Sequence, residues 1–198
     1  MPIITADMVK ELRKATGAGV LDCKKALEAN GGDVEKAKAY LREKGIAAAA
    51  RKADREVKEG LIEAYVHAGG RVGALIELDC ETDFVARTEE FRALAHDLAM
   101  QVVAANPLYL APEDIPPHVL EEETKDYRAQ ARDAGKPEHV IEKVVEGKLQ
   151  KYYQEVCLMK QPFIKDDELT VQDIITRMIA KVGENIVVRR FARFGLGG

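Results

Sequence analysis

The segment Glu81-Thr82-Asp83-Phe84-Val85-Ala86-Arg87 sets one large aromatic ring among charged side chains. It follows a strongly β-forming stretch, 72–80, and precedes a long helical pattern that begins near Thr88. Connecting segments run over the protein surface, so such a ring either folds back under its own domain or stays available to a pocket on another protein. In the second case Phe84 would act as a wedge between two elements of a partner, and Asp83 would bring a negative charge between them.

Cysteine and histidine are the other side chains suited to nucleophilic or metal chemistry, and their spacing here favours neither. The scattered cysteines form no CxxC pair, and their odd number disfavours a secreted disulfide framework. The histidines show no HExxH spacing, and the chain has neither a serine nor a glycine-rich phosphate-binding motif. We therefore expect no metal, no cofactor and no enzymatic activity. The residues concerned are Cys23, Cys80, Cys157, His67, His96, His118 and His139.

Composition places the chain among ordinary water-soluble proteins. Its 198 residues carry 30 basic and 34 acidic side chains, so the formal net charge of -4 implies neither nucleic acid nor an anionic membrane as partner. The longest aliphatic run, 46–50, is far shorter than the roughly 18 to 20 residues of a membrane helix. The first residues lack the basic region of a signal peptide, and a cytoplasmic location is expected.

Residues 5–45 predict three short helices. Gly17-Ala18-Gly19 and Asn30-Gly31-Gly32 separate them, Asp33 caps the third, and Gly45 is expected to end it. The inward-facing residues recur at helical spacing: Met8, Leu12 and Ala15, then Val20, Cys23, Ala26 and Leu27, then Val34, Ala37 and Leu41. The unit resembles a ubiquitin-associated-type three-helix module, a kind that usually binds other proteins.

The remaining sequence predicts a small sheet with covering helices. Strands at 61–66 and 72–78 flank a glycine pair suited to a hairpin turn, and the β-branched segment 184–194 is expected to pair with them as a third strand. The long helix after the tip carries an apolar face that should cover the hairpin. Further helical patterns lie at 118–134, 138–146, 147–158 and 171–182.

The expected fold class is therefore α+β: an N-terminal three-helix ubiquitin-associated-like module, followed by a small antiparallel sheet covered by helices. We expect a partner-docking module at 1–50, a charged and helical linker at 51–58, and an α+β core domain at 59–198.

The closing strand allows a second interpretation, because its arginines alternate with aromatic rings. Such a pattern occurs on nucleic-acid-binding surfaces, where cations meet phosphate and rings stack on bases. The alternative is that the arginines pair with acidic residues on neighbouring strands, which the acidic overall balance favours. The residues are Arg189, Arg190, Arg193, Phe191 and Phe194, and the expected acidic neighbours are Glu63, Glu77 and Glu81.

Two long blocks, 12–27 (LRKATGAGVLDCKKAL) and 77–87 (ELDCETDFVAR), are similar to the two signatures of the bacterial elongation factor Ts family. The stretch 183–191 (GENIVVRRF) also resembles that family, so the similarity spans essentially the whole chain. One departure is Asp79, where the family usually has Asn. Another is length, because many members carry a duplicated core domain and this chain has room for one copy. Short members of this kind are expected to form homodimers, through the sheet or its covering helices.

The resemblance implies a guanine-nucleotide exchange factor for elongation factor Tu, with no direct nucleic-acid or membrane partner. Thr82, Asp83, Phe84 and Val85 would enter the nucleotide-binding domain of the partner and disturb its magnesium site. Phe84 would be the wedge, Asp83 would compete near the magnesium ion, and Thr82 and Val85 would hold the shape of the tip. The three-helix module would dock on the same domain, and the expected docking residues are Leu12, Arg13, Thr16, Gly17, Ala18 and Gly19.

Two other functions are compatible with the residues alone. A plain adaptor would bind a partner through its three-helix module and dimerise through its α+β domain, without changing any nucleotide off-rate. A ribosome- or RNA-associated protein would use the Arg-Phe strand, and its binding would fall steeply with added salt.

Overall fold

The computed structural model describes residues 4–197, which form a mixed fold of helices and small sheets. The chain divides into two compact units, each built from three segments. The first comprises Met1–Glu63, Glu77–Ala95 and Asp173–Arg189, and the second comprises Ala64–Ile76, His96–Gln172 and Arg190–Gly198. Within the described part of the chain no helix is both long and apolar enough to cross a membrane.

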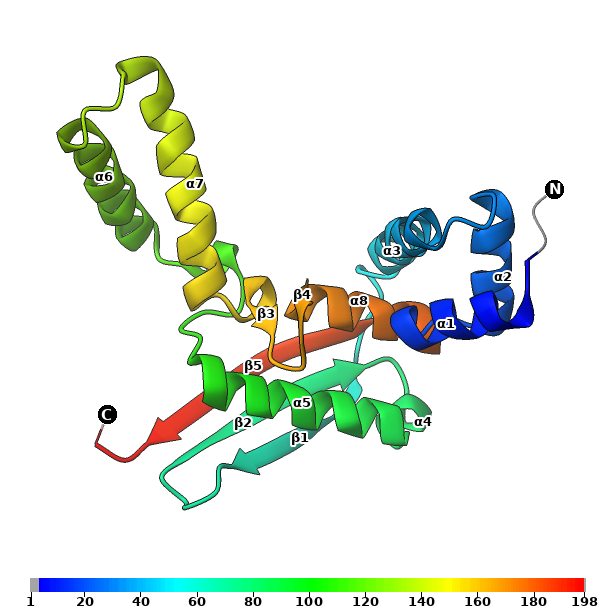
Figure 1. Ribbon diagram of the computed structural model, residues 1–198. Helices are drawn as coiled ribbons and strands as arrows, with labels where there is room; N and C mark the ends of the chain where they lie inside the picture. The colour runs from blue at the N-terminus through cyan, green and yellow to red at the C-terminus, as the bar shows by residue number, and fades with distance from the viewer. Residues whose placement is uncertain (1–3, 198) are drawn as a thin grey trace. The chain divides into compact units, whose positions relative to one another are not determined.

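Three helices open the first unit: α1 (Ala6–Thr16), α2 (Val20–Ala29) and α3 (Val34–Ala50) (Figure 1). The hydroxyl of Thr5 accepts a hydrogen bond from the Met8 amide, and the Asp33 carboxylate accepts one from the Lys36 amide at 3.0 Å, so both caps follow the usual preference. The core of this group is fully buried and consists of Leu12, Cys23, Ala26, Leu27 and Ala37. The three predicted helices are thus confirmed.

Three details of this prediction are wrong. Ala15 is exposed, so it does not face inward on α1. Val20 is 52% exposed, so it lies outside the apolar stripe of α2. Helix α3 continues through Gly45 to Ala50 instead of ending there. A Cβ atom on Gly45 would lie 3.7 Å from the Thr176 side chain and 4.0 Å from that of Ala180, both on α8 (Val171–Val182). Packing against α8 therefore outweighs the low helix propensity of glycine.

The larger sheet has the strand order β1-β2-β5, with β1 (Glu59–Val66), β2 (Val72–Cys80) and β5 (Ile186–Gly195). Gly69 and Gly70 in the β1–β2 connection have φ values of 91° and 68°, as the hairpin turn requires. One face of helix α5 (Glu89–Ala105) is buried, and so are alternate residues of β2 and β5, as expected of a sheet covered on one side. The buried residues are Phe91, Leu94, Ala95, Leu98, Ala99 and Val102 on α5, with Ala74, Ile76, Leu78, Cys80, Ile186 and Val188 on the strands.

A helical hairpin dominates the second unit, formed by α6 (Pro117–Asp133) and α7 (Glu138–Val156) (Figure 1). Two separate helices were expected over 138–158, but α7 is continuous through the exposed Gly147. Its buried residues Ile141 and Val145 pack with Ala131 of α6, and Leu149, which follows Gly147, packs against the same cluster, so the packed face continues across the glycine. Two short 3-10 turns, Pro112–Asp114 and Leu158–Lys160, and a small antiparallel pair, β3 (Pro162–Phe163) and β4 (Asp166–Thr170), complete the unit.

Candidate partner-binding site

The tip between β2 and α5 is a single helical turn, α4 (Asp83–Ala86). Thr82 is its N-cap, and the Thr82 hydroxyl accepts a hydrogen bond from the Val85 amide at 3.5 Å. Ala86 points inward and is 8% exposed, whereas the Phe84 side chain is 79% exposed. The fold-back alternative is therefore wrong, because the ring faces solvent instead of its own core.

The base of the tip is tied to the residues that precede β5. The Glu184 carboxylate accepts hydrogen bonds from the Glu81 amide at 3.2 Å, the Thr82 amide at 3.0 Å and the Thr82 hydroxyl at 2.6 Å. In the opposite direction, the Asn185 amide donates to the Glu81 carboxylate at 2.6 Å. Hydrogen bonds to charged groups are stronger than neutral ones, so this reciprocal arrangement fixes where the tip leaves the sheet.

Asp83 forms an ion pair inside the tip itself. Its Oδ2 atom lies 2.8 Å from a guanidinium nitrogen of Arg87, one helical turn further on. Both side chains are substantially exposed, so the pair is weak in water and open to exchange for a partner's charges. The negative charge that the sequence analysis assigned to the tip is thus partly neutralised in the free protein.

Cys80 ends β2 directly below the tip but offers no reactive thiolate. The side chain is fully buried, and burial, followed by the negative charge of Glu184, raises the pKa of the thiol to about 11. The Cys80 thiol donates a hydrogen bond to the Thr82 carbonyl oxygen at 3.1 Å. This cysteine therefore belongs to the support of the tip.

The docking residues expected from the resemblance gather in the turn between α1 and α2. The Thr16 hydroxyl donates to the Leu12 carbonyl oxygen at 2.7 Å and accepts from the Ala18 amide at 3.4 Å, while Gly17 adopts a left-handed φ of 69°. Leu12 is fully buried and serves the core of the module. The turn therefore presents Arg13, Gly17 and Gly19 to solvent, with Thr16 and Ala18 half-buried.

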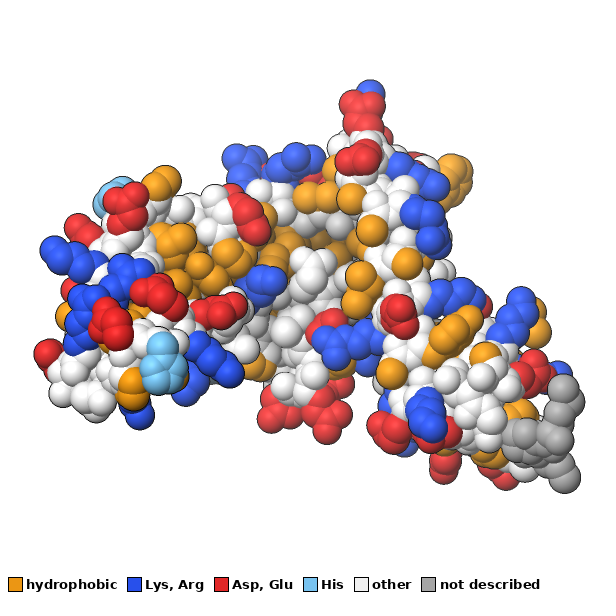
Figure 2. Space-filling model, turned by 90° about the horizontal axis from the view of Figure 1, so that it is seen from above, with side chains coloured by type: hydrophobic (Ala, Val, Ile, Leu, Met, Phe, Trp, Pro, Cys, Tyr) orange, Lys and Arg blue, Asp and Glu red, His pale blue; other side chains and the backbone are white. Residues whose placement is uncertain are grey.

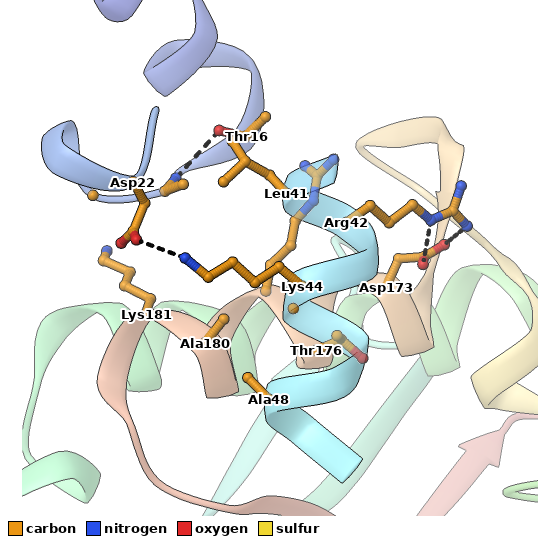
Figure 3. Close-up of a pocket in the computed structure, with 14 residues that line it drawn as sticks. Thr16, Asp22, Leu41, Arg42, Lys44, Ala48, Asp173, Thr176, Ala180 and Lys181 are labelled. Carbon is orange, nitrogen blue, oxygen red and sulfur yellow. Dashed lines mark hydrogen bonds and ion pairs between the residues drawn. The ribbon is translucent and has the colours of Figure 1, made fainter. Parts of the chain in front are cut away.

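A cleft of about 200 Å³ lies where α3 and the α1–α2 turn face α8, within the first unit (Figure 3). On one side of it the Arg42 guanidinium donates two hydrogen bonds to Asp173, at 3.1 and 2.9 Å (Figure 3). On another side Lys44 contacts Asp22 at 3.3 Å. The Arg42–Asp173 pair joins α3 to α8, and the Lys44–Asp22 pair joins α3 to α2, so together they form a joint that holds the three helices on α8. Sequence reasoning missed this joint, since Arg42 and Asp173 lie 131 positions apart.

Arginine pairing within the sheet is confirmed for Arg189, although its acidic partner differs from those expected. The Arg189 Nε atom donates to the Asp79 carboxylate at 2.8 Å, and Arg193 donates to the Val103 carbonyl oxygen at 3.3 Å. On the face seen in Figure 2, basic and acidic side chains are interspersed, and neither sign forms an extended patch there. The strand therefore uses these two arginines in its own structure.

Among the described residues, no group of three or more His, Cys, Asp or Glu side chains is arranged to hold a metal ion. The family model for elongation factor Ts matches residues 20–178, from the start of α2 to the last part of α8. The chain belongs to the elongation factor Ts family.

Individual relatives extend this match to nearly the whole chain. Elongation factor Ts of Carboxydothermus hydrogenoformans is 58% identical over 195 residues, which cover 98% of this chain and 90% of the relative. The proteins of the same name from Caldanaerobacter subterraneus and Moorella thermoacetica are also 58% identical over 195 residues, covering 98% and 96% of those relatives. The family model begins after the α1–α2 turn, whereas these relatives include α1, so both candidate contact surfaces lie within the shared sequence.

Proposed function

We propose that this chain is a guanine-nucleotide exchange factor that binds elongation factor Tu in the cytoplasm and promotes release of GDP. It makes and breaks no covalent bond. The observation that carries the proposal is the exposed Phe84 ring on a capped helical turn, beside Asp83, in a member of the elongation factor Ts family. A large exposed ring on a fixed support is typical of a residue that anchors a protein interface.

The proposed mechanism acts on the magnesium ion that helps to hold the nucleotide. Magnesium requires near-ideal octahedral geometry and has few protein ligands in nucleotide sites, so a small displacement of those ligands weakens its binding. Phe84 enters between elements of the partner's nucleotide-binding domain and shifts them. Asp83 adds a competing negative charge close to the ion.

Arg87 determines how much of that charge the partner meets. In the free protein the Arg87 guanidinium is 2.8 Å from Asp83. Entry of the tip into a partner requires Asp83 either to leave Arg87 or to carry it along as a neutral pair. The exposed position of both side chains keeps the cost of separation low, in the range of about 0 to 1 kcal/mol.

The three-helix module supplies affinity in this proposal. Its solvent-facing turn offers Arg13, Gly17 and Gly19 to the partner, while Thr16 and Ala18 shape the backbone from below. The Arg42–Asp173 ion pair holds the module against α8, which belongs to the same compact unit as the tip. When the turn docks, the tip therefore lies near the same region of the partner's surface in each encounter.

Exchange of this kind has no preferred direction. A factor that weakens nucleotide binding is itself displaced when nucleotide rebinds, because the coupling free energy between the two sites is reciprocal. The factor speeds equilibration, and the cellular ratio of the two nucleotides decides which one the partner retains.

We further propose that two copies of the chain associate through the open face of the sheet. Apolar side chains in the second unit lie exposed around β1, β2 and the end of β5, and they line one shallow hollow: Ala64, Val66, Leu75, Phe194 and Leu196. Contiguous exposed apolar surface of this kind marks an association site. Sedimentation equilibrium of Leu75→Lys should give a monomer where the parent gives a dimer, and an unchanged mass would exclude this face.

The deciding experiment is stopped-flow release of a fluorescent GDP analogue from elongation factor Tu. The parent chain should raise the release rate. Phe84→Ala should reduce this acceleration by an amount that corresponds to about 2 kcal/mol or more of lost interaction free energy, if the ring is an interface anchor. Leu108→Ala is the matched control, because Leu108 is 61% exposed in the second unit and outside the proposed contacts. Binding of the parent chain without any change in release rate would identify an adaptor and overturn the proposal.

A further inference from the structure

Glu184 and Asn185, which directly precede β5, together support the tip by hydrogen bonds to its base. The Glu184 carboxylate accepts three of the hydrogen bonds at the tip base: two from backbone amides and one from the Thr82 hydroxyl. The hydroxyl also accepts from the Val85 amide, so the contact of Glu184 continues directly into the helical turn that carries Phe84. One side chain thus determines the position of the N-cap of α4.

Asn185 links the same support to the segment that follows the three-helix module. Its side-chain amide donates to the carbonyl oxygens of Ala53 at 3.2 Å and Arg55 at 3.0 Å. Its backbone amide donates to Glu81 at 2.6 Å, and the Asn185 side chain is only 4% exposed. Glu184 and Asn185 are adjacent in sequence. Together they contact the tip base and the linker segment 51–58, which we call the connector.

We propose that Glu184 and Asn185 are positioning residues for nucleotide exchange, which fix the direction of the Phe84 ring relative to the connector that carries the docking module. The inference rests on the proposed function. Neither residue needs to touch the partner. Their effect reaches it through Thr82, which lies two positions before Phe84.

The number and type of these hydrogen bonds distinguish a positioning support from general stabilisation. One carboxylate with three donors on two consecutive residues leaves the tip base little freedom to rotate or shift. A wedge acts only when it enters at the correct angle, and a displacement of about 1 Å in a positioned group is enough to lower a rate by up to roughly 100-fold. Removal of the support should therefore lower the maximal rate of GDP release more than it lowers the affinity of this chain for elongation factor Tu.

The test compares Glu184→Ala, Glu184→Gln and Asn185→Ala as full-length chains, with Glu168→Ala as a control. Glu168 is an exposed carboxylate on β4, so its loss changes the net charge equally without touching the tip. Each variant is titrated against elongation factor Tu to obtain the maximal GDP-release rate and the half-saturating concentration. Amide hydrogen exchange at Glu81 and Thr82 is measured in the free protein.

Glu184→Ala should lower the maximal release rate roughly ten-fold while the half-saturating concentration stays within about two-fold of the parent. Glu184→Gln should recover much of the loss, because its amide oxygen still accepts from the two backbone amides. Asn185→Ala should show a smaller fall, since its backbone contact to Glu81 remains. Exchange of the two amides should accelerate in Glu184→Ala and stay at the parent value in Glu168→Ala.

Two results would overturn the inference while the proposed function stands. One is a parent-like maximal rate in Glu184→Ala. The other is an equal loss in the Ala and Gln variants with unchanged amide protection. If the parent chain itself does not accelerate release, the proposed function fails, and the amide measurements still report separately on whether Glu184 holds the tip base.

Discussion

The Arg189 Nε atom lies 2.8 Å from the Asp79 carboxylate, across the neighbouring strands β5 and β2. Asp79 stands where the resemblance leads one to expect Asn, and its charge is paired within the sheet. Its side chain is only 13% exposed, whereas that of Arg189 is 51% exposed. The extra negative charge beside the tip is thus compensated locally.

A double-mutant cycle measures the worth of this pair. Asp79→Asn and Arg189→Gln should each lower the free energy of unfolding by about 1 kcal/mol or less, because the arginine is half exposed and solvent screens the interaction. The double variant should lose less than the sum of the single losses, with a coupling near 0.5 kcal/mol. Urea unfolding gives all four values, and strict additivity would show that the pair adds nothing to stability.

Arg87→Ala should unmask the charge of Asp83. We expect a change of less than about 0.5 kcal/mol in stability, since the ion pair is exposed. In the exchange assay we expect faster GDP release at low salt, with the gain over the parent shrinking at high salt. Lys151→Ala, exposed on α7 in the second unit, removes one positive charge away from the tip and is the matched control. Slower release in Arg87→Ala alone would mean that Arg87 makes its own contact with the partner.

Gly45 allows a test of how closely α3 and α8 pack. Gly45→Ala should stabilise the protein by about 0.5 to 1 kcal/mol, because alanine favours a helix and the added Cβ would meet only ordinary contacts at 3.7 and 4.0 Å. Gly45→Leu should destabilise it by about 1 to 3 kcal/mol, since the longer side chain would push against α8. Thermal unfolding gives the change in Tm of each variant. Changes of the same sign in both variants would contradict this packing.

The buried thiols should make stability depend on pH only in alkaline solution. Burial raises the pKa of Cys80 and Cys157 from the ordinary thiol value of 9.0 to about 11. Because the unfolded chain loses these protons first, their contribution to stability is complete below pH 9 and is lost between about pH 9 and 11. A Cys80→Ala/Cys157→Ala variant should lack this part of the decline.

Alkylation provides an independent check of the same burial. At pH 8, iodoacetamide should leave Cys23, Cys80 and Cys157 unmodified in the native protein and label all of them after unfolding in urea. Rapid native labelling of Cys80 would mean that the tip base opens readily, which would also weaken the proposed role of Glu184.

Much of the fold follows from local sequence. Glycine-bounded helical periods predicted α1 and α2, and the two-glycine hairpin predicted the connection of β1 to β2, because these signals act over a few neighbouring residues. The end of α3 was missed since its continuation depends on Thr176 and Ala180, which lie far away in sequence. The short strands β3 and β4 gave no usable period, being 2 and 5 residues long.

The candidate site shows the same division. The placement of Phe84 and Asp83 left open whether the ring folds back or faces outward, and the family resemblance favoured the exposed position. The residues that support them were not predicted, because Glu184 reaches Thr82 across 102 positions and Arg42 reaches Asp173 across 131. No pattern within a single segment indicates such pairings. The proposed division into 1–50, 51–58 and 59–198 stays a prediction, but the expected helical linker is wrong, because α3 ends at Ala50 and residues 51–58 form turns and irregular chain.

Helix α3 also determines how the first two helices are rotated about its axis relative to α8. Leu41, Arg42, Gly45 and Ala48 all line the cleft beside α8, at spacings that return to one side of a helix. Each residue of an α-helix turns the chain by about 100° and advances it by about 1.5 Å. One residue inserted before Arg42 would rotate the first two helices away from α8 and separate Lys44 from Asp22, while the buried cluster of the three helices, which ends at Ala37, would stay intact. The length of α3 is thus as much a part of the design as its composition, and evolution would be expected to change it, if at all, by whole turns.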